Sequence, residues 1–110
     1  MAGGDRAVPL DVRGHHFEPT EELLDYATKH VEKLGRYFTG LRRLELILKQ
    51  DGRAGFQAEL VAHAVRGKQL AAQGSSVKAM TAAIDAAVDR MERQLVRFKE
   101  RLQDHRPHGV

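Results

Sequence analysis

The sequence has 110 residues, the usual length of a single domain, and its 42% of hydrophobic residues is enough for one modest core. It contains no cysteine, which excludes disulfides and thiolate chemistry, and no apolar run near the roughly 20 residues that span a bilayer, so no membrane partner is expected. The net charge of +3 permits a polyanionic partner without requiring one, and the N-terminus lacks the apolar segment of a signal peptide, so we expect a cytosolic protein.

The first half of the chain predicts a strand, a helix and a second strand. Residues 7–14 alternate between apolar and other side chains, which is typical of a half-buried strand. Thr20 is a good N-cap, and the apolar residues after it recur at helical spacing: Leu23, Ala27, Val31 and Leu34. Gly35 and Gly40 bracket the end of this helix and the turn after it. Residues 41–50 alternate again and predict a second strand.

The next segment predicts two further strands. Asp51-Gly52 is a strong hairpin signal before a strand at 56–65. Residues 66–67 turn the chain into a shorter, weaker strand at 68–73.

Residues 74–76, Gly-Ser-Ser, then offer Ser75 or Ser76 as the N-cap of a helix from about 77 to about 103. The apolar stripe of this helix consists of Ile84, Val88, Met91, Leu95, Phe98 and Leu102. The order β-α-β-β-β-α predicts an α+β domain with both helices on one face of a four-stranded sheet. We expect a disordered N-terminus at 1–7, one domain at 8–103 and a flexible tail at 104–110.

The charges of the last helix are partly sorted by sign. On a helical wheel, the basic residues lie in file on one side of the exposed face: Arg90, Arg93, Arg97 and Arg101. The acidic residues lie on the other side: Asp85, Asp89, Glu92 and Glu100. Guanidinium groups in file repel each other by roughly a few tenths of a kcal/mol per pair, and a phosphate partner would turn that cost into affinity. The pattern therefore favours polyanion binding over a merely solvated face.

The first helix adds to this charge, because Lys29, Lys33 and Arg36 share one flank with His30 beside them. Since both helices should pack on the same face of the sheet, the two basic flanks could meet in a groove.

We expect neither an enzyme nor a metal or cofactor site. The six histidines do not combine into a helical i,i+4 pair with a carboxylate. There is no phosphate-binding glycine loop and no Ser/His/Asp signature. Asp85 and Asp89 are better explained as partners of nearby arginines than as acid–base groups, and Tyr37 and Phe38 as core residues rather than base-stacking platforms.

Two segments resemble a known family. "AAIDAAVDRMERQLVRFKERLQDH", at 82–105, resembles the C-terminal helix of the ribosome hibernation-promoting factor and ribosome-associated inhibitor family, also described as sigma-54 modulation or ribosomal subunit interface proteins. "VRGHHFEPTEELLDYATKHVEKLGRYF", at 12–38, resembles its opening strand and first helix. The resemblance covers about residues 8–105, with the elements in the same order.

The resemblance implies a fold similar to double-stranded RNA-binding domains and a non-enzymatic function. The partners implied are the small ribosomal subunit, through its 16S-type rRNA, and the 70S ribosome, with no small-molecule substrate. The protein would lie in the channel between head and body, block mRNA and tRNA, and inhibit translation in stress or stationary phase. By position, the resemblance assigns RNA contacts to Lys33 and to the arginines of the last helix. With the other basic residues, the predicted RNA-binding set is Lys29, Lys33, Arg36, Lys78, Arg90, Arg93, Arg97 and Arg101.

The chain departs from the family pattern at several positions. Thr81 replaces an aromatic residue, and Lys78 replaces an acidic or polar one. Leu24 and His30 lie where relatives often carry a basic residue, so the first helix would contribute less to binding.

Two other functions stay open on the sequence. A general double-stranded RNA-binding module would bind any A-form duplex equally. A protein–protein adaptor would use exposed apolar residues of the long helix, such as Val96, and its binding would survive high salt. By length, the chain resembles either the short form of the family or the N-terminal domain of a long form with an added dimerisation domain.

Overall fold

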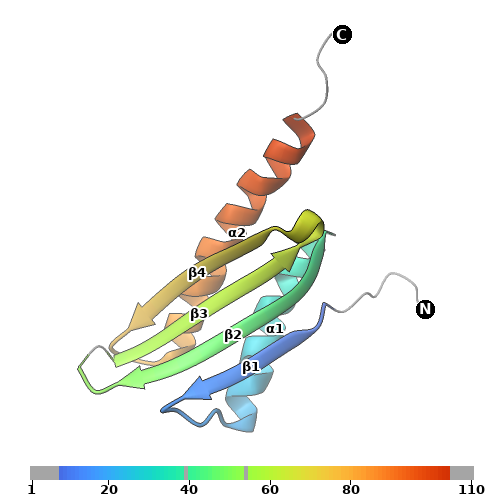
Figure 1. The fold of residues 1–110 in the computed structure, drawn as a ribbon. Coiled ribbons are helices and arrows are strands. Elements are labelled where there is room, and N and C mark those ends of the chain that lie inside the picture. The colour runs from blue at the N-terminus through green and yellow to red at the C-terminus, as the bar shows by residue number, and fades with distance from the viewer. Residues whose placement is uncertain (1–7, 39, 54, 105–110) are drawn as a thin grey trace, which may run out of the picture.

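A computed structural model of the chain describes residues 8–38, 40–53 and 55–104. The elements are β1 (Leu10–His15), α1 (Glu21–Tyr37), β2 (Leu41–Asp51), β3 (Gly55–Ala64), a 3-10 turn (Val65–Gly67), β4 (Gln69–Ser76) and α2 (Met80–Asp104). This order confirms the predicted β-α-β-β-β-α arrangement and the α+β class (Figure 1). The predicted disordered segment 1–7 and all of the predicted tail except Asp104 lie outside the described residues.

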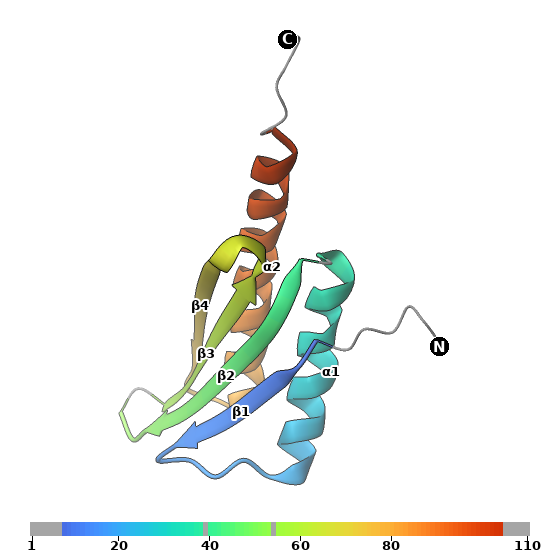
Figure 2. The same cartoon turned by 45° about the vertical axis from the view of Figure 1, so that its right-hand side comes forward.

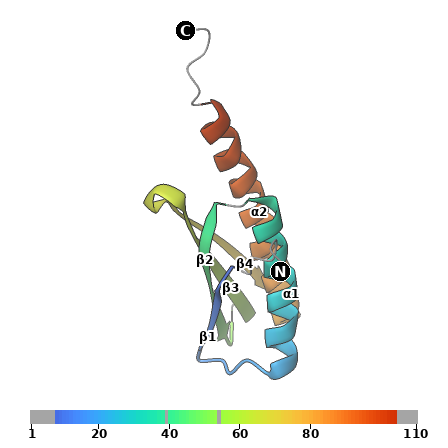
Figure 3. The ribbon, with the colours of Figure 1, turned by 90° about the vertical axis from the view of Figure 1, so that its right-hand side faces the viewer.

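The strands form one sheet in the order β1-β2-β3-β4. β1 runs parallel to β2, which the intervening helix α1 permits, whereas β2, β3 and β4 form an antiparallel meander. Viewed from its edge, the sheet carries both helices on one side and leaves its other face open (Figure 3). The predicted layering is confirmed.

The core lies between this covered face and the two helices. Leu44, Leu46 and Leu48 of β2 are fully buried, as their alternation predicts. The buried part of the α2 stripe also agrees with the prediction: Ile84, Val88, Met91 and Leu95. Helix α1 begins as predicted, with the Leu23 backbone N–H donating to Thr20 Oγ1 at 3.1 Å.

The end of β4 and the start of α2 differ from the prediction. β4 continues through the Gly-Ser-Ser segment to Ser76, and Gly74 pairs with Ala58 of β3. The Ser76 side chain accepts from the backbone N–H of Lys78 at 3.0 Å, so it shapes the loop, and the helix begins only at Met80. Gly74 was expected to follow the strand, but it is a strand residue whose lack of a side chain lets the helix approach.

Helix α2 packs against β4 with almost no space at Gly74. A Cβ on Gly74 would lie 2.3 Å from the Ala83 carbonyl oxygen and 2.5 Å from the Ala87 nitrogen. Both are helix backbone atoms, which cannot rotate away as a side chain can. The helix and strand can reach this separation only with glycine at this position.

We therefore predict that Gly74→Ala lowers the free energy of unfolding by about 2–3 kcal/mol, because the helix must move off the sheet. Gly52→Ala is the matched control, since no atom lies within 4 Å of the added methyl group. It should change stability by less than about 0.5 kcal/mol. Urea denaturation of both variants checks this, and equal midpoints would contradict the role of Gly74.

Candidate nucleic-acid interface

The basic residues predicted to bind RNA all have exposed side chains, so the fold presents every one of them to solvent. They do not form a single surface. The structure places Lys33 in the groove between the helices, Lys78 in the β4–α2 loop, and Arg90, Arg97 and Arg101 beside β4.

The groove between α1 and α2 corrects the expectation that two basic flanks meet there. Its α1 wall includes His30 and Lys33, but its α2 wall carries the acidic side chains of Asp85, Asp89 and Glu92. The sorting of charge along α2 is real, but its acidic flank faces α1. The groove is thus lined by opposite charges and is a poor site for a polyanion.

A polar contact joins the two helices in this groove. The Tyr26 hydroxyl donates to Asp85 Oδ1 at 2.7 Å, and His30 Nδ1 lies 3.6 Å from the same oxygen. The Tyr26 and His30 rings lie against each other, with 4.3 Å between their centroids. Burial, together with the hydrogen bond to and the charge of Asp85, raises the pKa of Tyr26 from its ordinary value of 10.0 to about 12.

The opposite flank of α2 lies along the free edge of β4. Arg90 Nη1 donates to the Gln73 carbonyl oxygen at 2.7 Å, and Gln94 Nε2 donates to the Ala71 carbonyl oxygen at 2.7 Å. These side chains satisfy two carbonyl groups that an edge strand would otherwise leave open to another chain. Arg90 therefore has a structural role that the helical wheel could not reveal, although its guanidinium keeps further donors.

The C-terminal part of α2 extends past the end of the sheet (Figure 1). The helix has 25 residues and is about 37 Å long, whereas the eight residues of β4 span only about 26 Å. Arg97 and Arg101 come from the C-terminal part of the helix and line a groove with Lys68, a cation that is absent from the predicted RNA-binding set. Neither arginine forms an ion pair with any residue that the structure describes.

The remaining predicted residues have other surroundings. Arg93 Nη2 lies 3.1 Å from Asp89 Oδ2, but both side chains are more than 60% exposed, so the pair contributes only about 0.3–0.5 kcal/mol and leaves the arginine available. Lys29 and Arg36 lie on the exposed surface of α1. Lys78 lies before the first turn of α2, at the end of the helix opposite the overhang.

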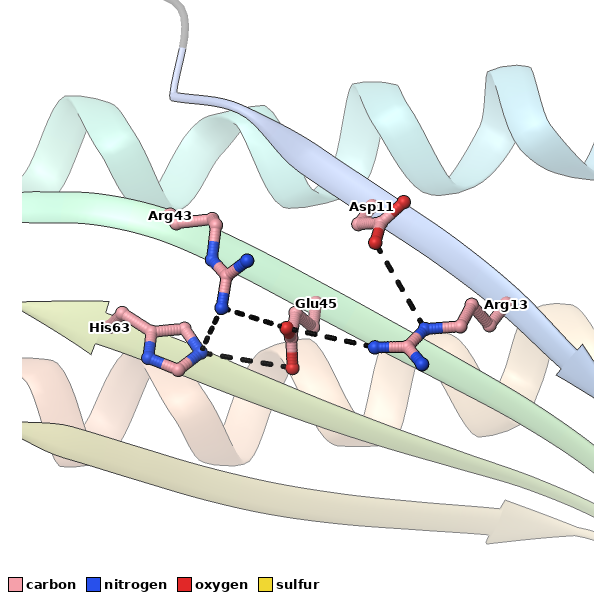
Figure 4. A network of polar contacts seen from close by, with 5 residues as sticks. All are labelled: Asp11, Arg13, Arg43, Glu45 and His63. Atoms are coloured by element: carbon pink, nitrogen blue, oxygen red, sulfur yellow. Dashed lines mark hydrogen bonds and ion pairs between the residues drawn. The ribbon is translucent and has the colours of Figure 1, made fainter.

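The open face of the sheet carries balanced charge instead. The Glu45 carboxylate is surrounded by Arg43 at 3.0 Å, Arg13 at 3.8 Å and His63 at 3.7 Å (Figure 4). Arg13 also lies 4.0 Å from Asp11. Because the arginines of this face already have carboxylate partners, the face is less suited to phosphate than the α2 overhang.

The described part of the chain holds no group of three or more histidine, aspartate or glutamate side chains placed to bind a metal ion. Neither α1 nor α2 combines the length and the apolar character that a helix needs to cross a membrane.

The contact between Tyr26 and Asp85 predicts a pH dependence of stability. Because the pKa of Tyr26 is higher in the folded state, its stabilising effect is complete below pH 10 and is lost as the pH rises through about 12. Replacing the only other tyrosine, Tyr37, with Phe isolates the Tyr26 phenol for an ultraviolet titration, which should give a midpoint near 12.

Tyr26→Phe is the control for stability. It should lower the free energy of unfolding by about 1 kcal/mol at neutral pH, because it removes the hydrogen bond to Asp85. The difference between the two proteins should vanish at high pH. A midpoint at the ordinary value of 10.0 would show that Tyr26 and Asp85 are not in contact in solution.

Comparison with known proteins identifies the family. Residues 10–103 match the family described as Sigma 54 modulation protein / S30EA ribosomal protein. The chain is 32% identical over 96 residues to the ribosome hibernation promoting factor of Salmonella typhimurium, which covers 87% of this chain and 98% of that protein. The factor of the same name from Escherichia coli is 30% identical with the same coverage.

Solved structures agree with this assignment. The N-terminal domain of Thermus thermophilus Protein Y matches with a TM-score of 0.70 and 30% identity, over 84% of this chain and 99% of that one. A ribosomal subunit interface protein from Coxiella burnetii matches with a TM-score of 0.76 over the same shares, and its 15% identity supports the fold alone. The resemblance seen in the sequence is confirmed, and the chain belongs to the Sigma 54 modulation protein / S30EA ribosomal protein family.

Proposed function

We propose that this protein is a ribosome hibernation factor. Residues 8–103 bind the rRNA of the small subunit in the decoding channel, where they exclude mRNA and tRNA and inhibit translation in the cytoplasm during stress or stationary phase. The role is stoichiometric and non-enzymatic. Support comes from the family and from relatives named ribosome hibernation promoting factor.

The observation that carries the proposal is the exposed cationic flank of α2. Arg97 and Arg101 have no ion pair among the described residues, and Arg93 has only an exposed one. Guanidinium groups bind phosphate oxygens through paired hydrogen bonds, so this flank suits an RNA backbone better than a protein surface. The apolar alternative is weaker, because Val96 is the one large apolar side chain exposed on the described part of α2.

Phosphate contacts then supply most of the affinity, and they make binding sensitive to salt. With about five to seven such contacts, log K should fall with log salt concentration with a slope of about −4 to −6. Occupation of the decoding channel inhibits by exclusion, so no step of bond chemistry is required.

The first experiment is co-sedimentation with purified 70S ribosomes at two salt concentrations, with and without mRNA and initiator tRNA. We expect saturable binding that salt weakens and that mRNA with tRNA displaces, because they compete for one channel. Binding that tRNA leaves unchanged would contradict the proposed location. Equal binding to ribosomes and to an arbitrary A-form duplex would favour a general RNA-binding module instead.

Reversing two charges tests the cationic flank directly. Arg93→Glu with Arg97→Glu should weaken binding to the small subunit by about a hundredfold or more and reduce the magnitude of the salt slope by about 2, because two phosphate contacts are lost. Both side chains are exposed, so the thermal midpoint should stay close to that of the wild type.

Lys49→Glu with Arg53→Glu is the matched control, because it makes the same change in net charge on β2 and the β2–β3 hairpin. Binding should change much less in this variant. If both double variants lose affinity equally, only net charge matters and the assignment to α2 is wrong.

A further inference from the structure

A groove lies between the β3–β4 turn and the overhanging end of α2. It encloses a volume of about 250 Å³. Lys68 and Leu70 come from the β4 side, and Gln94, Arg97, Phe98 and Arg101 come from α2. The C-terminal end of α2 continues past the β3–β4 turn (Figure 2), and the residues that line the groove come from both sides, the start of β4 with the turn before it and α2.

The groove is cationic on both walls and contains no carboxylate. Lys68 faces Arg97 and Arg101, and these three side chains are exposed and form no ion pair with other described residues. Leu70 and Phe98, which are partly buried, supply its apolar part. Low polarity next to the cations strengthens their attraction for an anion. The groove between α1 and α2 differs, since its charges already offset each other.

Two irregularities of the backbone add arginines at the same end of the sheet. The register of β2 and β3 shifts between Leu41 and Arg43, which leaves Arg42 unpaired and exposed. Arg66, in the turn before Lys68, has a φ of 64°, in the left-handed region where asparagine or glycine is usual. The two-residue turn itself requires this conformation, since Gly67 also has a positive φ, of 70°, and the Lys68 N–H donates to the Val65 carbonyl oxygen at 3.3 Å. The hairpin does not explain the choice of arginine, which costs about 1 kcal/mol or more relative to glycine at such a position and places another cation at this end of the sheet.

We propose that this groove holds the phosphodiester backbone of an RNA strand. Lys68 contacts the backbone from the sheet, and Arg97 and Arg101 contact it from the helix. Arg66 and Arg42 continue the cationic path across the end of the sheet. The groove adds a second wall to the RNA-binding surface of α2. That the ligand is RNA rests on the proposed function.

A groove with two walls fixes the path of a bound RNA strand, whereas a single cationic helix face does not. A strand bound on one face can slide along the row of arginines, since each phosphate is equivalent. A strand held between Lys68 and the arginines has its path fixed, because it must leave the groove past the β3–β4 turn. The contacts from the two walls therefore act on the same stretch of backbone and should be energetically coupled.

A double-mutant cycle on the full chain tests the coupling. The variants are Lys68→Ala, Arg101→Ala and their combination, and the probe is a labelled, unstructured RNA of about 12 nucleotides, measured by fluorescence anisotropy over a salt series. We expect each single variant to lose about tenfold in affinity and to reduce the magnitude of the salt slope by about 1. The double variant should lose at least about threefold less than the product of the single effects.

Arg53→Ala is the control, since it removes one exposed cation from the β2–β3 hairpin, away from the groove. It should bind RNA nearly as the wild type does. None of the replaced side chains is buried, so unchanged thermal midpoints verify that each variant is folded.

The outcomes separate this inference from the proposed function. If Lys68→Ala binds the RNA like the wild type while Arg101→Ala is weakened, the groove does not hold the backbone and α2 binds alone. Purely additive losses would likewise overturn a shared site. Coupled losses on the RNA probe in a protein that fails to bind 70S ribosomes would support the groove and reject the hibernation function.

Discussion

The contact of α2 with β4 at Gly74 is the constraint on which the arrangement of the surface depends. The helix backbone at Ala83 and Ala87 occupies the space that any side chain at Gly74 would need. Alanines line this part of the core, and their small side chains allow the helix backbone to lie close to the strands. Such a contact leaves little freedom for the helix to rotate about its own axis. The rotation in turn decides which side chains of α2 face α1, which face the edge of β4, and which face solvent.

Part of the charge sorting along α2 follows from that rotation and serves the fold. Asp85 faces α1, where it accepts the hydrogen bond of Tyr26, and Arg90 faces β4, where it donates to the Gln73 carbonyl group. A helix with acidic and basic flanks is therefore not in itself a sign of a polyanionic partner. Arg97 and Arg101 differ, since the described structure gives them no partner. These two unpaired arginines are therefore the part of the helix that points most clearly to a ligand.

Local periodicity made the fold predictable. The predictions that failed concern features that depend on tertiary contacts, which local periodicity does not reveal. The alternation of Leu44, Leu46 and Leu48 and the helical stripe of α2 depend only on residues close in sequence, so both predictions hold. Gly74 was predicted to lie outside the strand, because the reason for a glycine at this position is a tertiary contact, the close approach of α2. The two basic flanks do not meet in the groove between the helices, and a helical wheel cannot foresee this, because it says nothing of a neighbour's position. Lys68 carries no local signal, because only the β3–β4 hairpin brings it to α2.

The distribution of paired and unpaired arginines separates folding from binding. On the sheet, Arg13 and Arg43 surround Glu45, and their charge is offset within the domain. In the C-terminal part of α2, the arginines repel each other by roughly a few tenths of a kcal/mol per pair, and the core there offers only partly buried residues in return. Repulsion between the arginines thus lowers the stability of the free protein at the end of α2 where burial of apolar side chains contributes least to it. A phosphate backbone in the groove would remove the repulsion, so the same charges that weaken the free protein would stabilise its complex with RNA.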